Sequence, residues 1–306
     1  MFRYVLKRLG QTALTVLGVL AITFVLFKGV SGDAASAYLG DGAGESQKAQ
    51  WRHNHGYDLP AARQFLNHVR DCATFSGRSL RDNKTIADIF AQRGKYSLSL
   101  MLPAMALEWF LGLSLACLVA YYRGRWIDKF GVLLSVLGMC VPLLGMLIFA
   151  QWLMFRVGDG RYAFGLSQVG NIYVPIVVIA ACGVGGKVRF YRTIILEQLS
   201  CDYVRTAVAK GVHPAGVMFW HVLPNVMPAI LTGISSAIPF LILGSLLAES
   251  MFGIPGLGDL MVSSIANRDE PIMTALVFVT SLAYCLTILA TDIACAALDP
   301  RIRLGK

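Results

Sequence analysis

The residues best suited to chemistry in this 306-residue chain are a few carboxyl and imidazole groups in unusual settings. Glu108 and Asp292 lie inside long apolar runs, where an ionisable side chain is costly and is often kept for a function. Glu108, in the middle of its run, is the stronger candidate, because a neighbouring Lys or Arg would explain Asp292 equally well. His53, His55 and His68 do not suggest a metal site, because no cysteine or close acidic cluster completes a ligand set.

Motifs for catalysis or nucleotide binding are missing from the sequence. The segment from Gly183 to Val188 superficially resembles a phosphate-binding loop, but Ala181 occupies the position of the first glycine. Val188 also follows Lys187 where such a loop has Ser or Thr. No HExxH or GxSxG motif and no protease-like acidic pair occurs. We therefore expect that the chain is not an enzyme and holds no cofactor or metal of its own.

The composition indicates which solvent surrounds these residues. Hydrophobic residues make up 56% of the chain and charged residues only 15%, against roughly 25% charged in a soluble domain. The formal charge of +9 does not suggest nucleic acid, because the basic residues form short clusters between apolar runs rather than one continuous stripe. The lipid bilayer is therefore the expected partner, and nucleic acid is not.

Apolar segments of about 20 residues predict an all-α membrane protein with about six transmembrane helices. The fourth is interrupted near its end by glycines, so it either breaks there or continues toward Leu196. The first could be a signal peptide, since Ala35-Ser36-Ala37 resembles a cleavage site, but its apolar run is too long and favours an uncleaved anchor. The six predicted spans are Leu9 to Val30, Ser97 to Tyr121, Val132 to Phe155, Ile172 to Gly186, Pro228 to Ser250 and Thr274 to Leu298.

Basic residues in short loops predict the orientation, because Lys and Arg accumulate on the cytoplasmic side. They cluster before the first span, after the second, after the fourth and at the chain end, so both termini are predicted to be cytoplasmic. We expect three parts: residues 1–30 with the first anchor, an external loop or small cap at 31–96, and a transmembrane core at 97–306. The core includes a cytoplasmic loop at 197–224.

That cytoplasmic loop has the sequence features of a short helix. Ser200 or Asp202 can cap its start, while Gly211 followed by Pro214 stops it. A second helix is expected from Ala215 to Val222, ended by Pro224 before the fifth span begins.

The same loop resembles the inner-membrane permeases of ATP-binding-cassette importers, whose pattern is EAA, three residues, Gly, nine residues, then I-x-L-P. Arg205-Thr206-Ala207, Gly211 and Leu223-Pro224 occupy that pattern, with Arg205, Thr206 and His221 as departures. The stretch from Asp202 to Gly211 is instead similar to the dipeptide and oligopeptide (peptide/opine/nickel) branch. The blocks Gly56 to Pro60, Glu249 to Gly258 and Leu298 to Arg303 also look like that branch, and the long outer segment fits its subunit with a large first external loop.

The resemblance implies a permease subunit of an ATP-driven peptide importer in the bacterial inner membrane. It implies a second homologous permease, two cytoplasmic ATPase subunits or domains that bind ATP and Mg²⁺, and an external substrate-binding protein. Alternatives are a permease for nickel or another small solute, or an ion-coupled carrier that uses Glu108 or Asp292. The loop pattern distinguishes an ATP-driven permease from an ion-coupled carrier, because an ion-coupled carrier does not bind an ATPase through such a loop. The residues predicted to couple to the ATPase are Asp202, Tyr203, Arg205, Thr206, Ala207, Lys210, Gly211, Leu223 and Pro224.

A second functional segment is predicted after the fifth span. The glycines and proline from Gly253 to Gly258 break the helix, because glycine frees the backbone and proline removes a donor. Broken backbone at membrane depth is tolerated against protein or a watery cavity, so a gate-like turn near the translocation path is expected, with a simple exposed loop as the alternative. The pathway candidates are Glu108, Glu249, Pro255 and Gly256.

Overall fold

The computed structural model describes residues 2–30, 34–40, 42–81, 83–157, 170–243 and 246–298, and these ranges are almost entirely helical. Within them, β pairing is limited to one isolated antiparallel bridge between Arg78 and Thr85. The all-α prediction is therefore confirmed. The helices are α1 Phe2–Val30, α2 Ala34–Leu39, α3 Glu45–Asn54, α4 Ala61–Thr74, α5 Ile86–Tyr121, α6 Trp126–Cys140, α7 Leu143–Val157, α8 Gly170–Leu199, α9 Asp202–Ala209, α10 Pro214–Gly216, η1 Val217–Val222, α11 Leu223–Ser235, α12 Ile238–Leu243, α13 Leu246–Phe252, α14 Leu257–Asn267 and α15 Glu270–Leu298.

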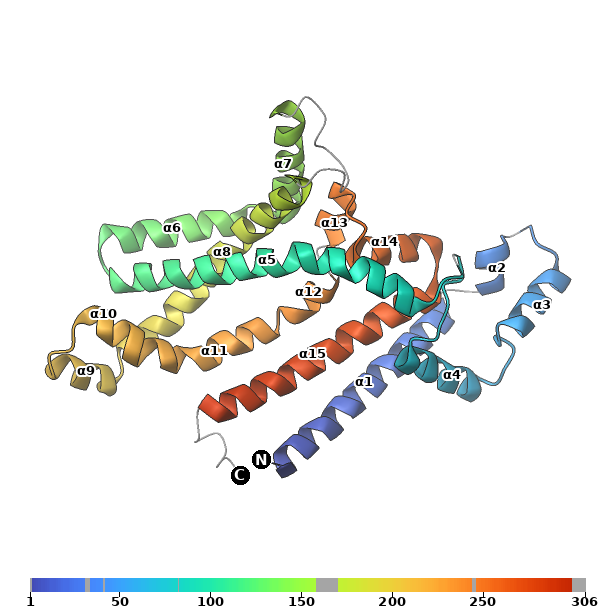
Figure 1. The fold of residues 1–306 in the computed structure, drawn as a ribbon, viewed down its shortest axis with the longest axis horizontal. Helices are drawn as coiled ribbons and strands as arrows, with labels where there is room; N and C mark the ends of the chain where they lie inside the picture. Colours follow the sequence, from blue (N-terminus) through green and yellow to red (C-terminus); the bar gives the residue numbers. More distant parts are fainter. Residues whose placement is uncertain are drawn as a thin grey trace.

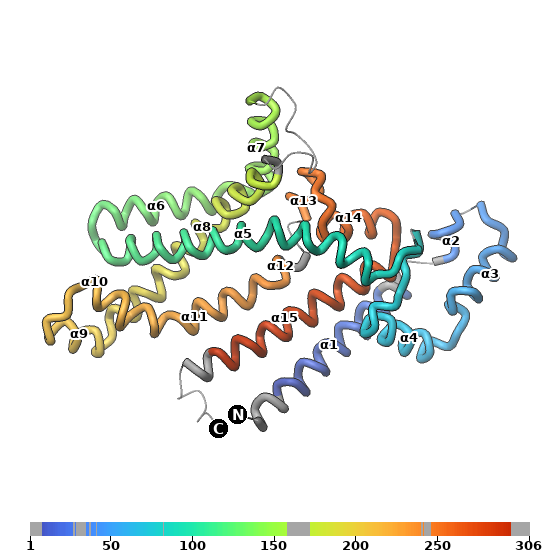
Figure 2. The backbone as a smooth tube through the Cα atoms, viewed as in Figure 1, coloured from blue at the N-terminus to red at the C-terminus, as the bar shows by residue number. Residues whose placement is uncertain are grey.

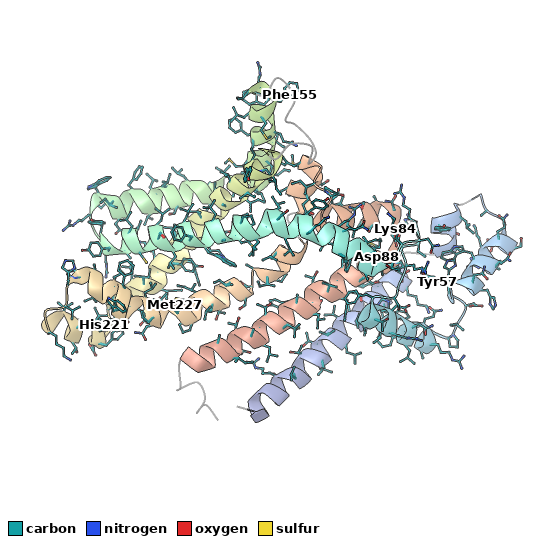
Figure 3. All side chains as sticks on the ribbon, in the orientation of Figure 1. Tyr57, Lys84, Asp88, Phe155, His221 and Met227 are labelled. Carbon is teal, nitrogen blue, oxygen red and sulfur yellow. The ribbon has the colours of Figure 1, made fainter. Side chains whose placement is uncertain are left out.

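In the described part of the chain, five helices are long and apolar enough to cross a membrane, and a bent pair of helices makes up to six, in agreement with the expected number. The five segments are Arg8–Leu26, Ile86–Tyr121, Ile172–Leu199, Pro214–Ser235 and Glu270–Ala294. Many large apolar side chains on α5, α6 and α7 are exposed, as expected for surfaces that face lipid or another subunit (Figure 3).

The third predicted span is not one helix. The segment from Val132 to Phe155 is divided between α6 and α7, which meet at an angle of 85°. Val141, between them, has an extended backbone, because the ring of Pro142 disfavours the helical conformation of the residue before it. Each of the two helices has 15 residues, about 22 Å, which is shorter than the hydrocarbon core of a bilayer.

The fourth predicted span does not break at its glycines. It continues as one helix toward and past Leu196, which is the second of the two outcomes expected from the sequence. Helix α8 runs for 30 residues to Leu199. Two of its glycines permit close packing instead of ending the helix: a β-carbon at Gly183 would lie 2.2 Å from Cδ of Glu108. One at Gly185 would lie 2.6 Å from the backbone oxygen of Ser135 on α6. Helix α5 also starts earlier than predicted, at Ile86, so the expected boundary between residues 96 and 97 falls inside a helix.

The fifth span differs from the prediction at both ends. Pro224 does not end a helix; it lies in the first turn of α11, which continues directly from the π-helical turn η1. A π-helical turn has wider i→i+5 hydrogen bonding, and it accommodates a proline whose nitrogen cannot donate. The predicted span Pro228 to Ser250 is itself divided into α11, α12 and α13, with a turn at Ser236 and Ala237.

The helices alternate in direction, so the segment from α2 to α4 and the segment around α9 lie at opposite ends of the molecule (Figures 1 and 2). Helices α2, α3 and α4 form the cap at one end, while α9 and α10 lie at the other (Figure 1). The buried core lies mainly between α5 and α8, and α1 packs along α15 (Figure 2). Arg8 on α1 forms an ion pair of 3.1 Å with Asp292 on α15, which gives Asp292 the basic partner expected for a structural role.

Candidate functional site

Helix α9 is short because both of its ends are fixed by the local sequence. Its N-cap is Cys201, which is extended and makes no side-chain cap hydrogen bond, so the expected cap by Ser200 or Asp202 is wrong. Asp202 instead occupies the first turn, where its charge favours the helix N-terminus. At the other end Gly211 has φ +80°, as a left-handed helix stop requires.

The hydrogen bonds at Gly211 close a complete Schellman motif. The Gly211 N–H donates to the carbonyl of Val208 at 2.9 Å, and the Val212 N–H donates to the carbonyl of Ala207 at 3.2 Å. The last carbonyls of α9 are thereby satisfied within the loop. The predicted stop at Gly211 is confirmed.

The inner face of α9 is packed against the rest of the chain. Val204 and Ala207 are buried, and they join a core cluster with Val217, Met218 and Val222 of the following segment. The cluster extends to α5 and α8. Ala207 therefore faces its own subunit, where its small side chain admits the neighbouring helix closely. One face of α9 is thus packed against helices of the same chain.

Side-chain hydrogen bonds add to this packing. The Tyr203 hydroxyl donates to Oε1 of Gln198 at 2.9 Å, which ties α9 to the end of α8. Burial raises the pKa of Tyr203, so its hydroxyl stays protonated and remains a donor. Leu223, at the start of α11, packs against the same cluster, whereas Pro224 beside it is exposed.

The outer face of α9 is polar and open. The side chains of Asp202 and Arg205 are 94% and 77% exposed, and Arg205 Nη1 lies 3.2 Å from Asp202 Oδ1. The Thr206 hydroxyl donates to the carbonyl of Asp202 at 3.0 Å. Lys210 and Gly211 are exposed, and among the described residues no atom beyond the immediate chain neighbours lies within 4 Å of the position a β-carbon would take at Gly211. This face presents charge and an unobstructed backbone.

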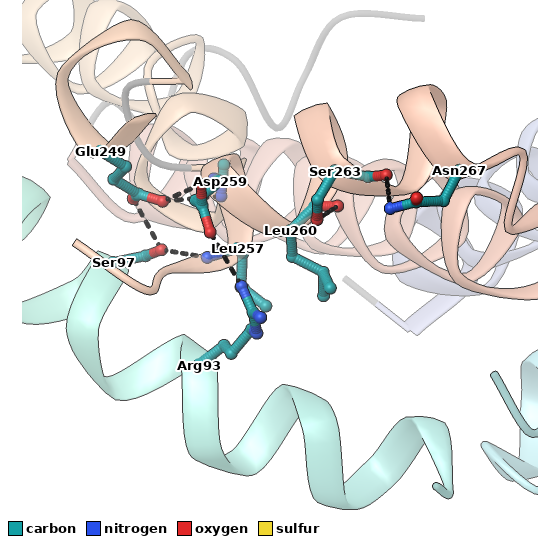
Figure 4. A network of polar contacts seen from close by, with 9 residues as sticks. Arg93, Ser97, Glu249, Leu257, Asp259, Leu260, Ser263 and Asn267 are labelled. Atoms are coloured by element: carbon teal, nitrogen blue, oxygen red, sulfur yellow. Dashed lines mark hydrogen bonds and ion pairs between the residues drawn. The ribbon is translucent and has the colours of Figure 1, made fainter. Parts of the chain in front are cut away.

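The second predicted segment is a buried turn at the start of α14 (Figure 4). Glu249 is 0% exposed, and its carboxylate accepts hydrogen bonds from the backbone of Gly258 at 2.7 Å and Asp259 at 3.1 Å. The Ser97 hydroxyl on α5 donates to the other Glu249 oxygen at 2.7 Å and accepts from the Leu257 N–H at 2.7 Å. A carboxylate at a helix N-terminus satisfies donors that have no partner within the helix.

Gly256 is the residue that lets this turn close. A β-carbon there would lie 2.3 Å from Oε2 of Glu249 and 2.5 Å from the Ser97 hydroxyl. Gly253 has φ +64°, and the helix break predicted in this segment is confirmed. Pro255 is partly exposed. The geometry assigns Glu249 and Gly256 to holding the turn against α5, and it encloses the Glu249 carboxylate in protein.

Glu108 also has a basic partner. Its side chain is 15% exposed, and its Oε1 lies 3.8 Å from Nζ of Lys187 on α8. Gly183 on α8 leaves the space into which the carboxylate fits, while a β-carbon at Gly112 would lie 2.6 Å from Cβ of Lys187. The four residues join the middle of α5 to α8.

Two ion pairs of the fold were missed from the sequence. Asp128, near the start of α6, accepts a bidentate pair of hydrogen bonds from Arg192 of α8 at 2.8 and 3.0 Å. Its carboxylate also accepts from the Gly124 N–H at 2.9 Å, and the side chain is buried. Arg93 on α5 pairs with Asp259 on α14 at 3.0 Å (Figure 4). In the sequence, the position of Asp128 in the first turn of a helix, just after Gly124 and Arg125, could have indicated a structural role for its carboxylate.

These features define a multi-pass helical membrane protein with a short, packed helix that exposes one polar face at one end, and a buried turn closed around Glu249 nearer the other. The chain belongs to the family of binding-protein-dependent transport system inner membrane components, whose model matches residues 111–304. The model of that family's N-terminal region matches residues 1–100. The predicted permease family is confirmed, and it is a transport family of the inner membrane, not an enzyme family.

Two relatives are similar over nearly the whole chain. The glutathione transport system permease protein GsiC of Salmonella typhimurium is 32% identical, and the match covers 99% of each chain. A protein of Sinorhizobium fredii named "Probable peptide ABC transporter permease protein y4tP" is 31% identical over 98% of this chain and 99% of its own length. The permease interpretation is thereby supported over an ion-coupled carrier.

Proposed function

We propose that this chain is a peptide-transporting permease subunit of an ATP-driven importer, and forms half of the translocation pathway with a second, similar permease. The two relatives support the substrate class, because one is named for peptides and the other for glutathione, which is itself a small peptide. An external binding protein delivers the solute. Two cytoplasmic ATPase subunits or domains bind ATP and Mg²⁺ and supply the energy.

In this proposal, both chain termini and α9 face the cytoplasm, and the cap formed by α2 to α4 faces outward. Among the short loops, the turn after α5 and the loop around α9 carry exposed basic residues, which supports the orientation. The cap segment also carries exposed basic residues, but it is longer than the roughly 60 residues to which the charge rule applies. The helix directions place these two loops at the end away from the cap (Figure 1). The residues concerned are Arg123, Arg125, Lys129, Arg205 and Lys210.

The observation that carries the proposal is the construction of α9. A helix closed by a Schellman motif at Gly211 and packed on its inner face through Val204 and Ala207 transmits displacement to α5, α8 and α11. Its outer face leaves Arg205 and Lys210 free to contact acidic or polar groups of an ATPase. ATP-driven movement of the ATPase is then passed to the membrane helices through a rigid contact.

We further propose that Glu108 and the turn around Glu249, Pro255 and Gly256 act at the translocation pathway. Glu249 and Gly256 fix the shape of the turn, and its attachment to α5 through Ser97 makes the turn follow movements of that helix. Coupled movement of α5 and α14 is a means by which displacement at α9 reaches the external end.

The test is uptake by the complete importer reconstituted into liposomes with its binding protein. Labelled di- and tripeptides should accumulate only when ATP is enclosed with the ATPase, and dissipating proton and sodium gradients should leave uptake unchanged. Uptake of Ni²⁺ without uptake of peptides would replace the proposed substrate. ATP-independent uptake that collapses with an ion gradient would overturn the proposed energy source.

A further inference from the structure

A cavity of about 260 Å³ lies between the cap and the transmembrane helices, away from α9 and the α14 turn. Its walls come from three parts of the chain: Phe24 of α1, the cap residues around Tyr57 and His68, and Glu270 at the start of α15. Tyr57, at the cap end of the molecule, marks its place (Figure 3). The functions proposed above do not use this cavity.

His68, in the wall of the cavity, has a buried ring nitrogen without a hydrogen-bond partner in the described part of the chain. Nε2 of His68 is buried and has no hydrogen-bond partner among the residues that the structure describes. Burial lowers the pKa of His68, against a smaller opposing effect of Asp71, so the ring is neutral near pH 7. A buried polar atom without a partner costs roughly 1–3 kcal/mol, and it points to a ligand or water in the cavity.

The partly buried carboxylate of Glu270 favours a cation in this cavity. Among the described lining residues, the partly buried Glu270 and the exposed Asp71 supply two carboxylates. Arg78 supplies a guanidinium, which is also exposed and whose Nη1 lies 3.5 Å from the backbone oxygen of Asn83. The Tyr57 hydroxyl donates to Oε2 of Glu270 at 3.3 Å. Burial raises the pKa of Tyr57 and keeps this hydroxyl a donor.

The form of the site favours an organic cation over a metal ion. In the described ranges no group of three or more His, Cys, Asp and Glu side chains is placed to hold a metal. Aromatic walls suit an alkyl ammonium, because the rings of Phe24 and Tyr57 can cover its carbon atoms and attract its charge. Lys28 is outside the lining, but its Nζ lies 5.6 Å from the centre of the Phe24 ring and donates to the lining residue Gln64 at 3.1 Å, so this wall already attracts one ammonium group.

We propose that this cavity binds a small primary ammonium group, which donates hydrogen bonds to the Glu270 carboxylate and to Nε2 of His68. The amino end of an amino acid or short peptide and the ethanolamine headgroup of a lipid share this chemistry. Binding there would fasten the cap to α1 and α15. The inference does not depend on which solute the permease transports.

The first test uses the native sequence and the thiol of Cys72, which lines the cavity and is buried. Burial raises its pKa to about 11, so alkylation by N-ethylmaleimide at pH 8 is slow and sensitive to occupancy. The full chain, in phosphatidylcholine nanodiscs, is treated with L-alaninamide or its N-acetylated analogue, and alkylation of Cys72 is followed by peptide mass spectrometry. Alaninamide should slow alkylation at least five-fold, and the acetylated compound should not.

A second arm separates the two sources of the ammonium group. Phosphatidylethanolamine in the nanodisc, without added amine, should protect Cys72 if the lipid headgroup reaches the cavity; protection by alaninamide alone assigns the site to a soluble amine. Equal effects of alaninamide and its acetylated analogue, or no protection by either ammonium source, would overturn the proposal.

Variants locate the binding groups. Alaninamide affinity, measured by calorimetry, should fall about ten-fold or more in Glu270→Gln and in His68→Phe. Glu45→Gln is the matched control, because Glu45 is a cap carboxylate with an 80% exposed side chain outside the cavity. Unchanged affinity in folded Glu270→Gln protein would refute the assignment, and the native-sequence protection test decides the case if that variant does not fold.

Discussion

Replacing Gly211 tests the coupling role of α9 because the cost inside the subunit can be separated from the cost at a partner. Gly211 has φ +80°, so the backbone conformation of an L-residue there costs about 1 kcal/mol of stability, and asparagine costs less. No atom other than its immediate neighbours lies within 4 Å of the added β-carbon, so a steric cost within the chain is not expected. The variant chains should therefore fold and insert at normal levels.

At a docked ATPase the outcome is different. If the open face around Gly211 is covered by the partner, an aspartate there places an unpaired carboxylate in the contact. Such a buried charge costs about 2–5 kcal/mol, which is about thirty-fold or more in affinity. Gly211→Asp should therefore lose the ATPase on purification and lose ATP hydrolysis stimulated by the peptide-loaded binding protein.

Two further variants identify the cause. Gly211→Asn has nearly the size of aspartate without the charge, so the difference between them isolates electrostatics. Gly211→Ala adds the backbone cost with little volume and should weaken docking least or not at all. Peptide binding by the separate binding protein should be unchanged throughout. Normal co-purification and normal uptake in Gly211→Asp would refute the coupling assignment.

Three other predictions follow from the structure. A reporter fused after Lys210 should be cytoplasmic and one near Asp58 external; an external signal at Lys210 would invert the topology and remove the basis for ATPase docking. Glu108→Gln should lower transport or membrane abundance more than Glu45→Gln on the exposed cap, measured as uptake per quantified complex, because its charge is paired within a span. Unchanged uptake and abundance would leave Glu108 without a required role. Gly256→Ala should destabilise the protein by about 1–3 kcal/mol, seen as a lower thermal midpoint in detergent, because its β-carbon cannot fit beside the Glu249 carboxylate. An unchanged midpoint would contradict the close packing of this turn.

The number of membrane segments was predictable, whereas their continuity was not. Hydropathy marks where a chain can lie in lipid, but whether a helix breaks depends on what its backbone groups find in three dimensions. At Pro142 the chain breaks, and α6 and α7 meet at an angle of 85°. At Pro224 the helix continues, because the π-helical turn η1 accommodates the proline. Both prolines lack an N–H, and the sequence does not say which neighbourhood can compensate for it.

The roles of the glycines were predictable where they depend on local sequence, and not where they depend on tertiary packing. Gly211 lies where a stop is needed, before a proline, and its left-handed backbone follows from local sequence. Gly183 and Gly185 of α8 suggested a break but allow contacts with Glu108 on α5 and Ser135 on α6, far away in sequence. Such close approaches belong to tertiary packing, and a single sequence does not display them.

The residues predicted to couple to the ATPase divide into two groups in the structure. Ala207 and Leu223 pack against the chain's own core, and Gly211 supplies a backbone conformation, so the fold of the subunit is sufficient to explain them. Asp202 and Arg205 are different, because their exposed side chains contact little beyond each other and an exposed i,i+3 ion pair contributes only a few tenths of a kcal/mol. The fold alone gives no reason for their charges. If the loop binds an ATPase, the first group determines whether α9 is rigid enough to transmit movement, and the second determines which partner it accepts.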